Sequence, residues 1–135
     1  MKNIFIVLTL VWFGFIANSF SADFDKGLDA ARSGDYATAL KEWRPLAEQE
    51  NADAQYNLGL MHLMGQGGLT KDSVKAVEFF LEAALQGNAD AQNNLGVMYH
   101  MGEGVEQDNS EAKKWYAKSA AQGHVDAQTN LEAVE

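Results

Sequence analysis

The chain has 135 residues, a formal net charge of −9 and no cysteine, and 47% of its residues are hydrophobic. This length is enough for one small domain with a buried core. The acidic balance argues against binding to nucleic acid and against electrostatic binding to anionic lipid, because both need a basic surface.

The first 21 residues are predicted to be a secretory signal peptide. Lys2 supplies a short positive segment, an apolar run follows over residues 4–17, and small residues stand at Ser19 and Ser21. We expect cleavage after Ser21, which places the protein in a periplasm or outside the cell, without a membrane attachment. The alternative is an uncleaved membrane anchor, because the run is only slightly shorter than a minimal span of ~17 residues.

The next segment, residues 22–51, is predicted to be a pair of helices over residues 23–33 and 35–49. Gly34 separates the two helices, and Asp35 stands where a helix-capping side chain is expected. The pair has the tight turn of a tetratricopeptide unit, and we expect it to cap the N-terminal end of the fold.

The rest of the chain repeats itself. Ala54-Gln55 recurs as Ala91-Gln92 and as Ala127-Gln128, at spacings of 37 and 36 residues. A fixed period of this kind is typical of a stacked array of helical repeats. It defines two full units, residues 52–88 and 89–124, and a single capping helix in residues 125–135. Within the full units, helices are expected over residues 52–64, 72–86, 89–101 and 108–122.

Glycines in the repeat predict where helices approach each other and where they end. Gly59 and Gly96 lie mid-helix, where glycine costs ~1 kcal/mol relative to alanine, so we expect the second helix of each unit to pack closely there. The last helix has no second helix after it, and Glu132 takes the equivalent position. Gly87 and Gly123 follow helix ends and are expected in the left-handed conformation.

The first helix pair departs from this pattern at its end. Glu50 stands where Gly87 and Gly123 stand in the later units. A side chain with a Cβ is strained in the left-handed region, so we expect Glu50 to destabilise the fold.

The repeat resembles the Sel1-like repeat, a relative of the tetratricopeptide repeat. In the third unit the motif residues are Ala91, Leu95, Gly96, Tyr99, Gly102, Gly104, Val105, Asp108, Ala112, Trp115, Tyr116, Ala120 and Gly123. In the second unit they are Ala54, Leu58, Gly59, Gly65, Gly67, Leu69, Asp72, Ala76, Phe79, Phe80, Ala84 and Gly87, with His62 in place of the tyrosine. The resemblance implies an all-α solenoid of stacked antiparallel helix pairs, with about seven helices.

The first helix of each full unit is unusually poor in charge. No charged residue occurs from Ala54 to Thr70 or from Ala91 to Gly102. An uncharged polar helix face is either covered by protein or a binding surface. The resemblance implies a concave groove on these helices, and our candidate partner-binding residues are Tyr56, Leu60, Leu63, Met64, Asn93, Val97, His100 and Met101. The alternative is that neighbouring helices cover this face.

We interpret the protein as an exported, non-catalytic interaction module, expected to be a monomer, that binds a peptide or protein surface in this groove. Envelope assembly, host contact and immunity against secreted toxins are equally compatible roles. No catalytic or cofactor residues are assigned. A purely structural element that self-associates through the same groove is a further possibility.

Two alternative functions stay open. Cysteine-rich secreted Sel1-like proteins have been associated with penicillin binding or β-lactam hydrolysis, although the lack of cysteine here weakens that comparison.

The second alternative is a periplasmic Cu(I) site, because thioether and imidazole ligands suit this ion. Met61 and Met64 recur as Met98 and Met101, near His62 and His100 in the sequence. The competing interpretation of Met61 and Met98 is ordinary core filling, and no metal ligand is assigned.

Overall fold

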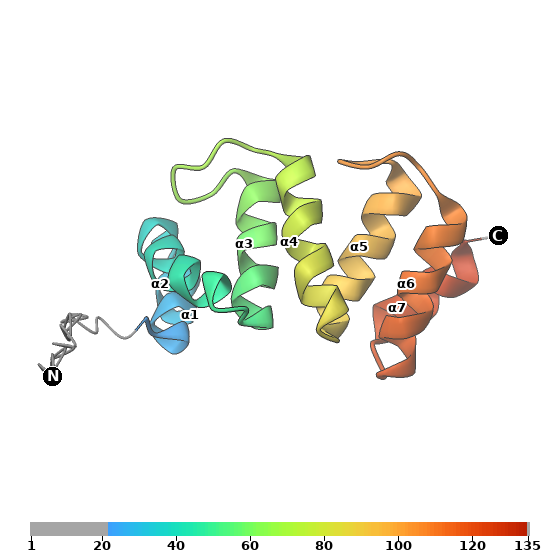
Figure 1. Ribbon diagram of the computed structural model, residues 1–135, viewed down its shortest axis with the longest axis horizontal. Helices are drawn as coiled ribbons and strands as arrows, with labels where there is room; N and C mark the ends of the chain where they lie inside the picture. The colour runs from blue at the N-terminus through green and yellow to red at the C-terminus, as the bar shows by residue number, and fades with distance from the viewer. Residues whose placement is uncertain (1–21, 135) are drawn as a thin grey trace, which may run out of the picture.

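The computed structural model describes residues 22–134, so the predicted signal peptide lies outside the described residues. The described part is all-α and consists of seven helices that stack side by side along one axis (Figure 1). Their bounds are α1 Phe24–Arg32, α2 Tyr36–Glu48, α3 Ala52–Met64, α4 Ser73–Leu85, α5 Ala89–Met101, α6 Asn109–Ala121 and α7 Val125–Ala133. We call α1, α3, α5 and α7 the first helices, and α2, α4 and α6 the second helices.

Each helix begins with a side chain that caps it. The capping residues accept a hydrogen bond from the backbone N–H three positions later, and they are Asp23, Asp35, Asn51, Asp72, Asn88, Asp108 and His124. These bonds satisfy N–H groups that have no partner inside the helix. At Asp35, the hydrogen bond from Thr38 lowers the pKa of the carboxyl below its ordinary value.

The two helices of each unit meet where a glycine faces an aromatic ring. A Cβ on Gly59 would lie 2.6 Å from the ring of Phe80, and one on Gly96 would lie 2.6 Å from the ring of Tyr116. Both rings are almost fully buried. The prediction that these glycines permit close helix packing is confirmed, and Gly27 serves α1 in the same way against Trp43.

The glycine loops between the paired helices also pack against backbone. Gly67 has φ 68° and Gly104 has φ 71°, values that favour glycine. A Cβ on Gly67 would lie 2.8 Å from the carbonyl oxygen of Tyr36, and one on Gly104 would collide with the carbonyl of Ser73. Each loop therefore rests on the start of the second helix of the preceding unit.

Polar side chains join helices within and between units. Within a unit, the Gln86 amide donates to Gln55 at 2.6 Å, and the Gln122 amide donates to Gln92 at 2.8 Å. Between units, Asn88, which caps α5, donates to Asp53 of α3 at 2.9 Å, and His124, which caps α7, lies 3.0 Å from Asp90 of α5. The first set ties each second helix to its first helix, and the second set links successive first helices.

The left-handed helix ends are confirmed. Gly87 has φ 93° and Gly123 has φ 86°, and Glu50 takes φ 62° at the equivalent place. Among the described residues, Glu50 is the one non-glycine residue with positive φ. The strain expected from its Cβ is therefore built into the structure.

Replacing Glu50 with glycine should stabilise the protein, because glycine adopts this conformation without strain. We expect a gain of about 1 kcal/mol in the free energy of unfolding, which raises the Tm by about 4 °C in thermal denaturation. Glu50→Ala is the matched control, since it removes the charge but keeps the Cβ, and it should bring no comparable gain. A lower Tm for Glu50→Gly would contradict the strain.

Gly96→Ala should destabilise the protein even though alanine is the better helix former. The added methyl group meets the buried ring of Tyr116, and overpacking of this kind costs about 2 kcal/mol. Urea unfolding would measure the loss. Glu132→Ala, at the equivalent position of α7, should leave the free energy of unfolding unchanged or slightly higher, and a Gly96→Ala variant as stable as the wild type would refute the close contact.

Candidate functional site

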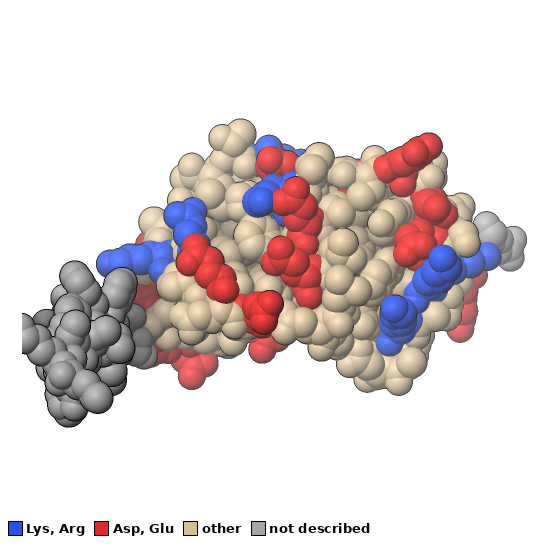
Figure 2. Space-filling model, viewed as in Figure 1, with Lys and Arg blue, Asp and Glu red and all other residues tan. Residues whose placement is uncertain are grey.

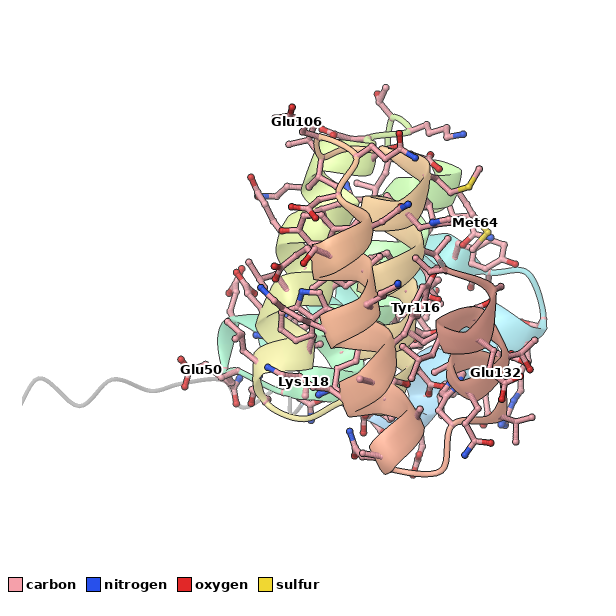
Figure 3. All side chains as sticks on the ribbon, turned by 90° about the vertical axis from the view of Figure 1, so that its right-hand side faces the viewer. Glu50, Met64, Glu106, Tyr116, Lys118 and Glu132 are labelled. Atoms are coloured by element: carbon pink, nitrogen blue, oxygen red, sulfur yellow. The ribbon has the colours of Figure 1, made fainter. Side chains whose placement is uncertain are left out.

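The first helices and the second helices form opposite sides of the array. Figure 3 shows Met64 of α3 and Glu132 of α7 on one side of the array. Lys118 of α6 lies on the other side, as does Glu50, which precedes α3, and Tyr116 lies between the two sides. We call the side formed by α1, α3, α5 and α7 the first-helix face. All eight candidate groove residues belong to α3 and α5 of this face.

The C-terminal half of the predicted groove is partly covered by α7. Asn93 is only 8% exposed, and its side-chain oxygen accepts a hydrogen bond of 3.0 Å from the amide of Asn130. Val97 is half-buried and packs against the cluster that contains Tyr116 and Val134. The prediction that Asn93 is accessible to a partner is therefore wrong, because the capping helix already occupies its polar group.

The middle of the groove is half-buried. Tyr56, Leu60 and Leu63 pack against the core cluster formed mainly by α4 and α5. The ring centroid of Tyr56 lies 5.9 Å from that of Phe80. Burial, helped by the nearby charge of Asp90, raises the pKa of the Tyr56 hydroxyl above its ordinary value. These side chains thus contribute to stability and present only part of their surface to solvent.

The ends of α3 and α5 are the most accessible part of the groove. Met64 is 54% exposed and Met101 is 67% exposed. The Nδ1 atom of His100 lies 3.1 Å from the side-chain oxygen of Asn109, which orients the half-buried imidazole. Exposed methionines are flexible apolar side chains that adapt to different partner surfaces.

A pocket of about 280 Å³ opens on the first-helix face between α1 and α3. Leu60 and Met64 line it from α3, while Leu28 and Ala31 line it from α1. The remaining lining residues are Arg32, Tyr36, Trp43, Asn57, Met61 and Gln66. Most of this lining is apolar, and Arg32 is its one charged side chain. We call it the α1–α3 pocket.

Leu60 and Met64 were among the predicted groove residues, whereas Leu28 and Ala31 of α1 were not. Leu28 and Ala31 stand at helical spacing, so an apolar side of this helix is visible in the sequence. Which part of that side stays uncovered depends on the angle between α1 and α3, and only the tertiary structure shows it.

A larger pocket, of about 670 Å³, lies on the opposite side between α2 and α4. It is lined by Leu40, Arg44, Ala47, Glu48, Glu50, Leu58, His62, Lys75, Phe79 and Glu82. Half of these residues are charged, some basic and some acidic. Figure 2 shows basic and acidic side chains interspersed on this face. A rim of solvated opposite charges is a poor site for an apolar anchor, so we assign greater weight to the smaller α1–α3 pocket.

His62 forms part of the wall of the larger pocket. Its ring stacks on Phe79 with the ring centroids 5.4 Å apart. Burial lowers the pKa of His62 below its ordinary value, and the charges of Arg44 and Lys75 act in the same direction while Asp72 and Glu78 oppose it. The neutral imidazole is therefore favoured in the folded protein.

The methionine pairs divide between core and surface. Met61 and Met98 are buried, which confirms their interpretation as core residues, whereas Met64 and Met101 face solvent. Within residues 22–134, no group of three or more His, Cys, Asp or Glu side chains is placed to hold a metal ion. The Cu(I) hypothesis concerns sulfur ligands as well, so it stays a prediction that titration of a metal-free sample would test.

The described helices are also too short or too polar to cross a membrane.

The recurring glycine–aromatic contacts and glycine loops mark a specific repeat family. The sequence profile of the Sel1 repeat matches residues 52–88 and 89–124, more than half of the chain. The chain belongs to the Sel1 repeat family. The resemblance expected from the motif residues is thereby confirmed. No protein with a curated description matches the chain significantly.

Two solved structures are similar to this Sel1 repeat protein. A Sel1 repeat protein from Oxalobacter formigenes is 33% identical with a TM-score of 0.77, over 81% of this chain and 44% of that one. A protective antigen present in uropathogenic Escherichia coli strains, which displays the Sel1-like repeat fold, is 33% identical with a TM-score of 0.66, over 78% of this chain and 27% of that one. The chain spans less than half the length of both relatives, and the fold is shared.

Acidification should weaken the fold through His62. Because the folded-state pKa lies below the unfolded value of about 6.5, the unfolded chain takes up the proton more readily. Stability should fall as the pH drops through about 6.5 and level off below the folded-state pKa.

Thermal denaturation between about pH 7.5 and about pH 5.5 would measure this effect. The matched variant is His62→Tyr, which copies Tyr99 at the equivalent place in the next unit. Its Tm should change less over this range than that of the wild type. Equal changes in both proteins would show that His62 does not carry the effect.

Proposed function

We propose that this Sel1 repeat protein is an exported, non-catalytic interaction module that binds a peptide segment or protein surface at the first-helix face. The observation that supports this function best is the α1–α3 pocket, a mostly apolar cavity of about 280 Å³ with Met64 exposed at its edge. Apolar pockets with a few polar groups are typical sites for an anchoring side chain.

The lining suggests what such a partner contains. Leu28, Leu60 and Met64 offer apolar surface to one large aliphatic or aromatic side chain. The amide of Asn57 donates to the carbonyl of Asp53 at 2.9 Å and keeps its oxygen as an acceptor for a peptide N–H. Arg32, which lines the pocket and forms an exposed ion pair with Asp29 at 3.4 Å, is available to exchange this contact for a carboxylate of the partner.

The remaining candidates have a reduced part in this proposal. Met101 and His100 extend the accessible surface along α5, whereas Asn93 and Val97 support α7. The proposed site is therefore centred on the N-terminal half of the array, where no helix precedes α1 among the described residues to cover α3 from that side.

The proposed location is a periplasm or the cell exterior, after removal of residues 1–21. Envelope assembly, host contact and toxin immunity all suit an exported binding module. The similarity to a protective antigen of uropathogenic Escherichia coli lends some support to host contact.

Selection of peptides from a displayed random library, followed by calorimetric titration, would test the binding function. We expect the selected peptides to share a large apolar residue. Met64→Asp should weaken their binding by at least about tenfold, because a charge at the edge of the pocket disfavours burial of that residue. The exposed position of Met64 makes this change tolerable for the fold.

Met101→Asp is the matched control. Met101 is the equivalent residue of the next unit and is also exposed, but it does not line the α1–α3 pocket. The affinity of the Met101→Asp variant for the selected peptides should stay within about twofold of the wild-type affinity. Selected peptides that bind Met64→Asp as tightly as the wild type would place the site elsewhere and refute the proposal.

A further inference from the structure

The outward sides of α4 and α6 carry opposite charges at equivalent positions of the repeat. The equivalent pairs are Lys75 and Glu111, Glu78 and Lys114, and Glu82 and Lys118. Within each helix the first two charges form an ion pair, at 2.6 Å in α4 and at 3.0 Å in α6. Figure 2 looks onto this side and shows acidic side chains along α4 and basic side chains along α6. The two helices thus present the same pattern with its signs reversed.

An exposed apolar stripe accompanies this charge pattern. Val74, Leu81 and Leu85 of α4 are 58%, 36% and 69% exposed, and their spacing of seven and four residues places them on one side of the helix. The equivalent residues are Ala37, Arg44 and Glu48 in α2, and Ser110, Ala117 and Ala121 in α6. Stacking of the repeats therefore does not require large apolar residues at these positions. An exposed stripe of this kind indicates a contact with another protein.

The stripe lies on the side of α4 that is directed toward α6. Arg44 and Glu48, the equivalents of Leu81 and Leu85 in α2, line the pocket between α2 and α4. By the repeat relation, Leu81 and Leu85 take the same place between α4 and α6. The apolar stripe consequently runs between the acidic side of α4 and the basic side of α6.

We propose that this surface, formed by α4 and α6, binds a second copy of the chain around a two-fold axis parallel to these helices. Such an axis places α4 of one protomer opposite α6 of its partner. It also brings the two apolar stripes together at the axis. Each protomer then contributes both an acidic and a basic helix, so the interface is self-complementary in charge.

The register of this arrangement follows from the repeat. Both helices run in the same direction through the array (Figure 1), and both have 13 residues after a capping aspartate, Asp72 or Asp108. A two-fold axis parallel to them preserves that direction, so positions of equal height face each other. Lys75 then meets Glu111, Glu78 meets Lys114, and Glu82 meets Lys118 on both sides of the axis.

The other two-fold axis in the plane of this surface is less favourable. An axis at right angles to the helices would place each helix against its own copy in the opposite direction. With Glu78 and Lys114 set against their own copies, like charges would meet at both positions, and only the outer two charges of each helix would lie near opposite charges. The parallel axis pairs all three charges of each helix with opposite charges, so the charges favour it.

Charge exchange tests the proposal. Sedimentation equilibrium of the wild type should show a mass that rises from one chain toward two with concentration. One variant carries Lys75→Glu, Glu78→Lys and Glu82→Lys, and the other carries Glu111→Lys, Lys114→Glu and Lys118→Glu. Each variant alone should dimerise at least about tenfold more weakly, because both of its contacts then pair like charges. An equimolar mixture of the two should regain the wild-type affinity, because every contact is again complementary.

Further variants separate this interface from other effects. Leu81→Asp with Leu85→Asp should abolish the dimer, while Ala117→Asp with Ala121→Asp, at the equivalent positions of α6 directed away from α4, should leave it intact. Met64→Asp should also leave the dimer intact, since it lies on the opposite face. Circular dichroism and Tm values establish that each variant is folded.

Three results would overturn the proposal. The first is a wild-type mass of one chain over the whole concentration range. The second is a wild-type dimer that both charge-exchanged variants form equally well. The third is a mixture of the two folded variants that associates no better than either one alone.

Discussion

The stack depends on the contact between a mid-helix glycine of each first helix and a buried aromatic ring of the helix that follows. Gly59 against Phe80 and Gly96 against Tyr116 bring the paired backbones close together, because a methyl group at either glycine would overlap the ring. This contact offsets the low helix propensity of glycine. Glycine loops rest on the preceding unit, and glutamine pairs join the two helices of each unit.

Repetition makes functional residues recognisable, since each unit serves as a control for the next. Side chains that recur in every unit are explained by stacking. Departures from the repeat are not explained in this way, and besides Glu50 and His62 they include two surfaces. One is the α1–α3 pocket, where α1 leaves Leu60 and Met64 partly uncovered. The other is the outer side of α4 and α6, where reversed charges flank an exposed apolar stripe. Because the two surfaces lie on opposite sides, the proposed dimer would leave the pocket accessible.

Much of the fold could be predicted because its causes are local. Aspartates that cap helices, glycines that end them and the repeat period determine where each helix begins and ends. The left-handed conformation of Glu50 could be predicted in the same way, from the glycines at the equivalent positions. The candidate groove was harder, because exposure depends on distant helices. Asn93 was a candidate groove residue because of the family resemblance, yet α7 follows directly and its Asn130 donates a hydrogen bond to the Asn93 side chain.

The sequence by itself determined the architecture, the helix limits and the glycine contacts, since these follow from short-range periodicity repeated from unit to unit. The tertiary structure decided which side chains stay exposed among the described helices. It placed Leu28 and Met64 in one pocket, buried Asn93 under α7, and left Leu81 and Leu85 of α4 exposed. The physical reason is that burial depends on how neighbouring helices cross, which the residue spacing within one helix does not reveal.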